Sequence, residues 1–331
     1  GECGMRNESV KLQEKRGLIS TAVLFPGQGS QSVGMGRDVA ESSAAARAVF
    51  NRANDVLGFD LARVCFDGPA AELERTDVQQ PAIFVTCVAI WKAWVEGGTP
   101  RDSFTHCGGL SLGEYTALHV AGAVSFEDAL RLVRRRGELM QQAAVASPSG
   151  MVSLVGADEA AAGALCERAR GGDVLVPANF NCPGQIVIAG SRSACERAVA
   201  LAGEFQCRAV PLAVAGAFHS PLMKSAADGL EPVLEQTHFT TPRMKVIANV
   251  DAEYHRDPGS IRDSLRRQVT QPVLWQRCVE RIMEDGVGRF VEIGPGRILT
   301  GLMRKINRNV PCANVSTVES IASALAITSA G

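Results

Sequence analysis

The segment Cys107–Tyr115, which reads CGGLSLGEY, joins a predicted strand to a predicted helix. Gly109–Gly113 fits G-x-S-x-G, the pattern of a nucleophile elbow, in which glycines on both sides of a serine permit a strained strand-to-helix turn. The pattern is frequent by chance in a chain with 33 glycines, so an ordinary glycine turn is the alternative. A helix over 114–121 would place backbone N–H groups near Ser111, where a developing oxyanion needs them.

Strands and helices alternate around this segment, which predicts an α/β fold. The expected elements are a strand over 21–25, a polar helix from Ser30, an apolar helix over 80–95 with Pro81 in its first turn, and strands over 245–250 and 289–293. We expect them to form a large domain, similar to the α/β-hydrolases, with a mainly parallel sheet.

A second unit begins near Gly150. Its expected elements are a strand over 151–155, a helix over 158–170, strands over 174–179 and 185–189, a helix over 193–204 and a strand over 207–214. This βαββαβ order is typical of a ferredoxin-like lobe. The predicted division is a lead-in over 1–17, a large α/β domain over 18–148 and 215–320, and an inserted small lobe over 149–214.

Composition narrows the class of partner. The chain has 34 basic and 35 acidic residues and a net charge of −1, so no global field attracts nucleic acid or anionic membranes. The longest apolar run, 82–95, is interrupted by Lys92 and is too short to span a bilayer. The ten cysteines are scattered without C-x-x-C spacing, which predicts reduced, mostly buried thiols in an intracellular protein and no metal site.

A serine nucleophile needs a base within hydrogen-bond reach, and the chain has five histidines. His106 and His119 flank the elbow and are interpreted as packed or surface residues. His238 and His255 lie in polar or turn-like surroundings with no partner indicated by the sequence. His219 lies in the small-residue loop GAFHSP where the small lobe ends, and a loop at a domain junction suits a catalytic base.

Two further segments have polar or glycine patterns of interest. Phe25–Gln31, FPGQGSQ, is a poor match to phosphate-binding loops but could supply a second backbone donor to an oxyanion. Arg134–Arg136 is interpreted as the end of a helix before Gly137. Arginine runs usually form a solvated face, but one guanidinium directed into a cleft could hold a substrate carboxylate by two parallel bonds.

Taken together, seven ordered motifs resemble those of the malonyl-CoA:acyl carrier protein transacylase family. The motifs are FPGQGSQ, GLSLGEY, RRRGELM, NFNCPGQIVIAG, GAFHSPLM, RRQVTQPVLW and EIGPGRILTGL, and they cover most of the chain between about Leu18 and Ala313. The resemblance implies transfer of a malonyl group from malonyl-CoA, through a serine ester, to the phosphopantetheine thiol of acyl carrier protein. It implies no cofactor, because the coenzyme A thioester is a substrate.

The resemblance also assigns roles to individual residues. It implies Ser111 as nucleophile, His219 as general base oriented by the backbone carbonyl of Gln268, the N–H groups of Gln28 and Leu112 as oxyanion donors, Arg136 as clamp for the malonyl carboxylate, and Met140 and Phe218 as lining of the acyl pocket. Leu110 departs from the histidine that most members have before the nucleophile. We expect it to point away from the base and to alter packing without loss of activity.

Three alternatives stay open. A serine esterase or thioesterase would share Ser111 and His219 but would usually need an acid between them in the chain. A non-catalytic module that binds carrier protein would have no use for the whole set. A malonyltransferase could also serve a polyketide pathway in place of fatty acid synthesis.

The remaining expectations concern docking and location. An acidic carrier protein needs a basic patch, and we place it at Arg304, Lys305 and Arg308, with solvated surface as the alternative. Malonyl-CoA and acyl carrier protein are the expected partners, with no nucleic acid or membrane. The expected location is the cytoplasm, or an organelle stroma or matrix after removal of a targeting segment.

Overall fold

The computed structural model describes residues 20–99 and 103–328, so the predicted lead-in over 1–17 lies outside the described residues. Its main sheet has five strands, all paired in parallel, in the order β7-β2-β1-β8-β9. The strands are β1 (Ser20–Phe25), β2 (Phe104–Gly109), β7 (Lys245–Val246), β8 (Val287–Ile293) and β9 (Cys312–Val315). The predicted parallel α/β architecture is therefore confirmed.

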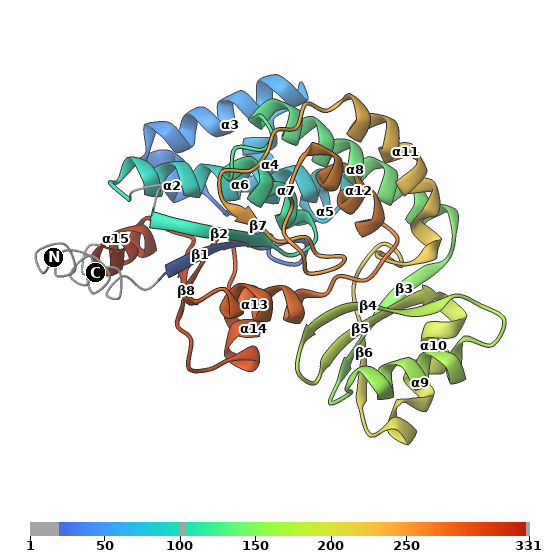
Figure 1. Cartoon of the computed structure of the whole chain (residues 1–331). Coiled ribbons are helices and arrows are strands. Elements are labelled where there is room, and N and C mark those ends of the chain that lie inside the picture. The colour runs from blue at the N-terminus through green and yellow to red at the C-terminus, as the bar shows by residue number, and fades with distance from the viewer. Residues whose placement is uncertain (1–19, 100–102, 329–331) are drawn as a thin grey trace, which may run out of the picture.

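Helices cover both faces of this sheet, with α3, α6, α7 and α8 on one side and α13 and α14 on the other (Figure 1). The helices of this part are α2 (Arg37–Ser42), α3 (Ala44–Leu57), α4 (Leu61–Asp67), α5 (Ala70–Leu73), α6 (Thr76–Glu96), α7 (Leu112–Val120), α8 (Phe126–Ala146), η3 (Pro221–Met223), α11 (Lys224–Gln236), α12 (Pro258–Gln268), α13 (Trp275–Glu284), α14 (Ile298–Ile306) and α15 (Val318–Thr328).

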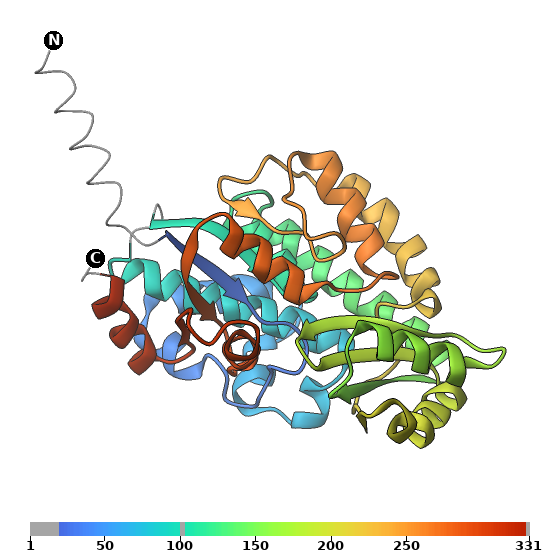
Figure 2. The same cartoon turned by 60° about the horizontal axis from the view of Figure 1, so that its bottom comes forward.

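A second sheet is antiparallel and forms a separate lobe (Figure 2). Its strand order is β4-β5-β3-β6. The elements are β3 (Ser149–Val155), α9 (Glu159–Arg170), β4 (Leu175–Cys182), β5 (Gln185–Ser191), α10 (Arg192–Leu201), η2 (Ala202–Phe205) and β6 (Arg208–Pro211). The lobe has its own hydrophobic core, in which Leu165 and Ala198 of the two helices pack against Ile188 of the sheet. The predicted element order is confirmed.

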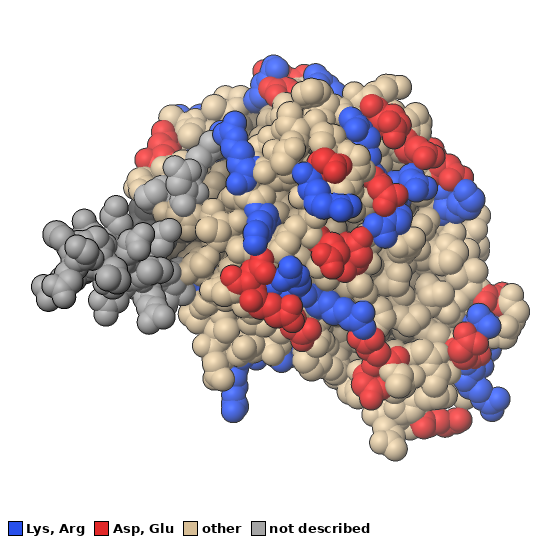
Figure 3. Space-filling view, viewed as in Figure 1, with Lys and Arg blue, Asp and Glu red and all other residues tan. Residues whose placement is uncertain are grey.

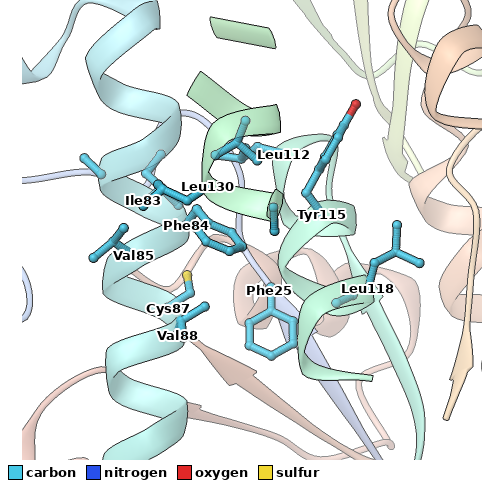
Figure 4. Close-up of a cluster of buried hydrophobic side chains, with 14 of the residues drawn as sticks. Phe25, Ile83, Phe84, Val85, Cys87, Val88, Leu112, Tyr115, Leu118 and Leu130 are labelled. Atoms are coloured by element: carbon cyan, nitrogen blue, oxygen red, sulfur yellow. The ribbon is translucent and has the colours of Figure 1, made fainter. Parts of the chain in front are cut away.

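The core of the larger lobe is built around α6. This helix is apolar around its whole circumference, which is the pattern of a buried helix, and it packs against both α3 and α8. Figure 4 shows Phe84 and Val88 of α6 beside Phe25 of β1 and Tyr115 and Leu118 of α7. The first strand and the helix after the elbow are thereby held against one rigid element.

Two helix starts differ from the sequence prediction. The segment from Ser30 is not helical, because Gly34 and Gly36 have φ of 97° and 76°, and α2 begins only at Arg37. The helix α6 begins at Thr76 and not at residue 80, so Pro81 lies in its second turn and removes one intrahelical hydrogen bond.

Two element ends also differ. Arg134–Arg136 lie in the middle of α8 and not at its end. The helix continues through Gly137. A Cβ atom at this position would lie 2.7 Å from the carbonyl oxygen of Thr76, so the glycine is required for close packing of α6 and α8. The predicted strand over 245–250 is only the two residues of β7.

The surface charge is mixed, with basic and acidic side chains interspersed on the face drawn in Figure 3. In the described ranges, no helix is long and apolar enough to cross a bilayer, and no cluster of three or more His, Cys, Asp or Glu side chains could hold a metal ion.

Candidate active site

The elbow is a strained turn at the carboxyl end of β2. Ser111 follows that strand by two residues and is the N-cap of α7, with φ of 53° and ψ of −104°. A positive φ in a residue with a Cβ atom costs about 1–3 kcal/mol and persists only where the surroundings impose it. The backbone strain is therefore located at Ser111 itself, at the start of α7.

The glycines that flank Ser111 were predicted to permit the strained turn, but the structure requires them for a different reason. In the described backbone, neither Gly109 nor Gly113 has a positive φ. A Cβ atom on Gly109 would lie 1.9 Å from the carbonyl carbon of Gly113, and one on Gly113 would lie 2.1 Å from the carbonyl oxygen of Phe25. The glycines are required because the two ends of the turn and the end of β1 lie in contact.

His219 is hydrogen-bonded to the serine. Its Nε2 lies 2.8 Å from Ser111 Oγ, and its Nδ1 lies 2.7 Å from the carbonyl oxygen of Gln268. Because a carbonyl only accepts, Nδ1 bears the proton and Nε2 is free to accept from the serine hydroxyl. Burial and the neighbouring Arg136 lower the pKa of His219 to about 4, although its hydrogen bond to Gln268 opposes the shift. The imidazole is therefore neutral at pH 7, as a general base must be.

Arg136 is a fully buried cation directed at the nucleophile. One terminal nitrogen donates to Ser111 Oγ at 3.0 Å and to Oε1 of Gln268 at 2.8 Å, and the other donates to Oε1 of Gln80 at 2.7 Å. Its carbon Cζ lies 5.2 Å from the centre of the Tyr115 ring. Burial lowers its pKa from the ordinary value. Within residues 20–99 and 103–328 it has no carboxylate at ion-pair distance and its Nε has no partner, so the guanidinium can still receive an anion.

The other two arginines of the run form a solvated face. Arg134 and Arg135 are half-buried along α8, and both pair with Glu138, at 3.0 Å and 3.1 Å. Of the three, only Arg136 is buried beside Ser111.

Two backbone N–H groups near the elbow are the candidates for donors to a developing oxyanion. Leu112 is the first residue of α7, so its N–H has no intrahelical acceptor. The loop that contains Gln28 lies against the elbow, since a Cβ atom on the preceding Gly27 would lie 2.4 Å from the carbonyl oxygen of Leu110. The N–H of Ser111 is already donated to Oδ1 of Asn249 at 2.6 Å and is not available for this role.

A cavity of about 280 Å³ leads to the serine from between the two lobes. Gln28, Leu110, Ser111, Phe218 and His219 line it from the larger lobe, Ile298 and Leu302 from α14, and Met151, Asn179, Asn181, Gln185 and Val187 from the small lobe. Phe218 is thus placed in the cavity. Met140 is fully buried and accepts a hydrogen bond from Gln80 at 3.5 Å, so it lies behind Arg136 and does not line this cavity.

The interpretation of His255 as a residue without a partner is wrong. Its side chain is fully buried, and its Nε2 lies 2.8 Å from Oε1 of Glu114. Glu114, Asn249 and Gln80 are further buried polar residues beside the site that motif reasoning missed. Glu114 stands inside GLSLGEY, where the motif offered a signal, but Asn249 and His255 lie far along the chain in segments without a pattern.

The remaining three histidines are packed or surface residues, as predicted. His106 lies 3.2 Å from Asp285, and Nδ1 of His119 lies 3.1 Å from the carbonyl oxygen of Val124. His238 is exposed. Every cysteine in the described ranges is a free thiol, and most are buried.

A strained serine, a neutral imidazole hydrogen-bonded to it, two candidate backbone donors and a buried guanidinium without an ion-pair partner in the described ranges together suit acyl transfer of an acyl group that bears a carboxylate. Residues 23–324 match the family described as the acyl transferase domain, which defines the class of protein.

Within that class, the malonyl CoA-acyl carrier protein transacylase of Salmonella typhimurium is 41% identical over 309 residues, which are 93% of this chain and 99% of the relative. The transacylase of Bacillus subtilis is 41% identical over 306 residues, 92% of this chain and 96% of the relative. The chain belongs to the malonyl CoA-acyl carrier protein transacylase family.

Solved structures agree. A malonyl-transacylase in complex with a type II polyketide acyl-carrier protein has a TM-score of 0.90 and 42% identity, covering 93% of this chain and 99% of that chain. An acyl carrier protein S-malonyltransferase from Vibrio cholerae has a TM-score of 0.89 and 42% identity, covering 92% and 99%.

Proposed function

We propose that the protein transfers the malonyl group of malonyl-CoA to the phosphopantetheine thiol of acyl carrier protein, as its relatives' names describe. The observation that supports this best is Arg136, a buried cation without an ion-pair partner in the described structure, whose guanidinium lies 3.0 Å from the nucleophile oxygen. A malonyl group has a free carboxylate, and a planar guanidinium binds carboxylates by two parallel hydrogen bonds.

The first half-reaction forms a malonyl-serine ester. Ser111 Oγ attacks the thioester carbonyl carbon while its proton passes to Nε2 of His219, and the N–H groups of Gln28 and Leu112 stabilise the tetrahedral oxyanion. The intermediate collapses with cleavage of the C–S bond. His219 returns the proton to the departing sulfur, and coenzyme A leaves as the free thiol.

The second half-reaction reverses these roles. The carrier protein's thiol gives its proton to His219, its sulfur attacks the ester carbonyl, and the C–O bond to Ser111 breaks while the serine recovers its proton. Nucleophile and base are supplied by side chains, so the proposed chemistry needs neither a metal nor an organic cofactor.

Water is the competitor at the ester stage. A hydrolase usually orients its histidine with a carboxylate, whereas Nδ1 of His219 donates to the carbonyl of Gln268. The nucleophile, base and clamp are each more than nine-tenths buried, which limits access of water. These features favour transfer over the esterase or thioesterase alternative, and the complete set of groups disfavours a module that only binds carrier protein.

The docking face is proposed to be α14. Arg304, Lys305 and Arg308 are exposed at its carboxyl end, and within the described ranges none of them has an ion-pair partner. Basic side chains project below this helix in Figure 3. Because Ile298 and Leu302 of the same helix line the cavity, an acidic carrier protein bound there would have its pantetheine arm at the entrance.

Three finer descriptions are also proposals. The small lobe is ferredoxin-like, which its antiparallel strand order and two helices support, and the larger lobe is similar to the α/β-hydrolases, which its strand–elbow–helix supports. The lobes divide at 18–148 plus 215–320 and at 149–214. Scattered free thiols support a reducing compartment, the cytoplasm or an organelle stroma or matrix, and the pathway served is fatty acid or polyketide synthesis.

Intact mass after mixing with malonyl-CoA tests the function. We expect one malonyl adduct in the wild type, its loss on addition of carrier protein with gain of malonyl on the carrier, and no adduct in Ser111→Ala. Release of free malonate as the main product, with no malonyl-carrier formed, would support the hydrolase alternative in its place.

A further inference from the structure

The catalytic groups are supported by a buried carboxylate that contacts none of the reacting atoms. Glu114 is fully buried on α7. Its Oε1 accepts a hydrogen bond from Nε2 of His255 at 2.8 Å. Its Oε2 accepts hydrogen bonds from Nε2 of Gln268 at 2.7 Å and from the backbone N–H of Asn249 at 3.0 Å. One carboxylate on α7 thus holds three positions of the segment 249–268, which lies more than 130 positions further along the chain.

One arm of this network fixes the guanidinium. A carboxylate only accepts, so Gln268 must present its amide nitrogen to Glu114, and its Oε1 then faces Arg136, which donates to it at 2.8 Å. The same amide nitrogen also donates to the carbonyl oxygen of Ser111 at 3.1 Å. Glu114 therefore decides which way the Gln268 amide faces, and the amide decides where Arg136 points.

The other arm fixes the elbow. The backbone of Asn249 is held by Glu114, while its side chain accepts from the N–H of Ser111 at 2.6 Å and donates to the carbonyl of Gly109 at 2.8 Å. These bonds hold the backbone on both sides of Leu110. They are part of what imposes the unfavourable φ of 53° on Ser111.

The network also separates the two charges. The Gln268 amide stands between the Glu114 carboxylate and the Arg136 guanidinium, and within the described ranges no carboxylate contacts Arg136 directly. A carboxylate in direct contact would compete with the carboxylate of the substrate. A carboxylate one amide away still compensates the buried cation and leaves its donors without a charged acceptor.

We propose that Glu114, held by His255, is a positioning residue that keeps Arg136 aligned and unpaired for a substrate carboxylate. It acts through Gln268 and makes no contact with substrate. The inference rests on the proposed function only for the choice of substrates. It requires that substitution of Glu114 lowers the transfer rate of a carboxylated acyl group more than that of an uncharged one.

Glu114→Gln is the direct test, with initial rates of acyl transfer measured for malonyl-CoA and acetyl-CoA. An amide at 114 can donate as well as accept, so Gln268 is free to turn its amide nitrogen toward Arg136. Loss of aligned charge-assisted bonds predicts a fall of at least ~30-fold in kcat/KM for malonyl-CoA, mostly through KM, against less than ~5-fold for acetyl-CoA.

Two further variants keep the test decisive. Glu138→Gln makes the same chemical change at a half-buried position of α8, where the carboxylate pairs with Arg134 and Arg135 away from the site, and should leave both rates unchanged. Should Glu114→Gln not fold, Gln268→Met removes the relaying amide while the backbone carbonyl that orients His219 stays. It should produce the same malonyl-selective loss.

The outcomes separate this inference from the proposed function. A wild type that forms no malonyl adduct by intact mass overturns the proposed function. A wild type that forms the adduct, with variants that lose malonyl and acetyl transfer equally or lose neither, overturns the positioning role and leaves Glu114 as a stabilising core residue.

Discussion

Replacing Arg136 by alanine should convert the enzyme from one that selects malonyl groups to one that does not. Each charge-assisted hydrogen bond contributes about 1.5–3 kcal/mol, and a guanidinium gives a carboxylate two of them. Loss of both removes about 3–6 kcal/mol, which corresponds to a fall of roughly 10²- to 10⁴-fold in kcat/KM for malonyl-CoA.

Acetyl transfer should respond differently to the same substitution. An acetyl group has no carboxylate for Arg136 to bind. For acetyl transfer the substitution therefore removes only the hydrogen bond from Arg136 to Ser111 Oγ. Since the Arg136 charge lowers the pKa of His219, its removal makes the imidazole a stronger base. We therefore expect acetyl transfer to be retained or increased.

The assay is acyl transfer from malonyl-CoA and from acetyl-CoA to carrier protein, with thermal melting of each variant. Arg134→Ala is the matched control, because that residue lies on the same helix and pairs with Glu138 at the surface. Arg136→Lys keeps the charge without the fork and should fall between wild type and alanine. Equal losses on the two substrates would refute the clamp.

Four other outcomes follow from the same geometry. Burial sets the pKa of His219 at about 4, below its ordinary value of 6.5, so kcat/KM should stay level from neutral pH until the pH approaches 4; a fall centred near 6.5 would contradict this. The same shift removes stability as pH falls from 6.5 toward 4, because only the unfolded histidine takes up a proton in that window. Ser111→Gly should abolish transfer but raise the free energy of unfolding by about 1 kcal/mol over Ser111→Ala, which keeps the strained Cβ; equal melting temperatures would remove the strain argument. Replacing Arg304, Lys305 and Arg308 by glutamate should raise KM for carrier protein, with KM for malonyl-CoA as control, and an unchanged value would exclude docking on α14.

Local patterns predicted the parts of the site that neighbouring residues determine. The elbow was predictable because strand, glycines, serine and helix are contiguous, and the structure has them in that order. Even there the reason differed, because Gly109 and Gly113 allow contact between segments while Ser111 takes the unfavourable φ. The motif identified the right residues without identifying the interaction that requires them.

Glycine was also the source of an error. Gly137 was interpreted as a helix stop, which put Arg136 at a helix end, although a glycine at that place allows α8 to pack closely on α6. A stop and a close helix contact leave the same mark in a sequence. Only the partner helix, 61 residues away at Thr76, distinguishes them.

The polar support of the site could not be predicted from one sequence. Glu114 and His255 are 141 positions apart, and Ser111 and Asn249 are 138 apart. No periodicity links such pairs, because the contact exists only after β2, β7 and α12 have been brought together. His255 therefore looked like an ordinary loop residue, while its burial and its acidic partner are properties of the fold.

Departures from local rules nevertheless coincide at one place. Ser111 and His219 both have a positive φ although neither is glycine, and Arg136 is a cation buried without a direct counter-charge in the described structure. Each departure is unfavourable alone, and the side chains of His219 and Arg136 both lie within hydrogen-bond distance of Ser111 Oγ. Such costs persist where function selects for them, so their coincidence locates the site independently of any motif. It also explains why Ser111→Gly should abolish transfer and yet be more stable than Ser111→Ala.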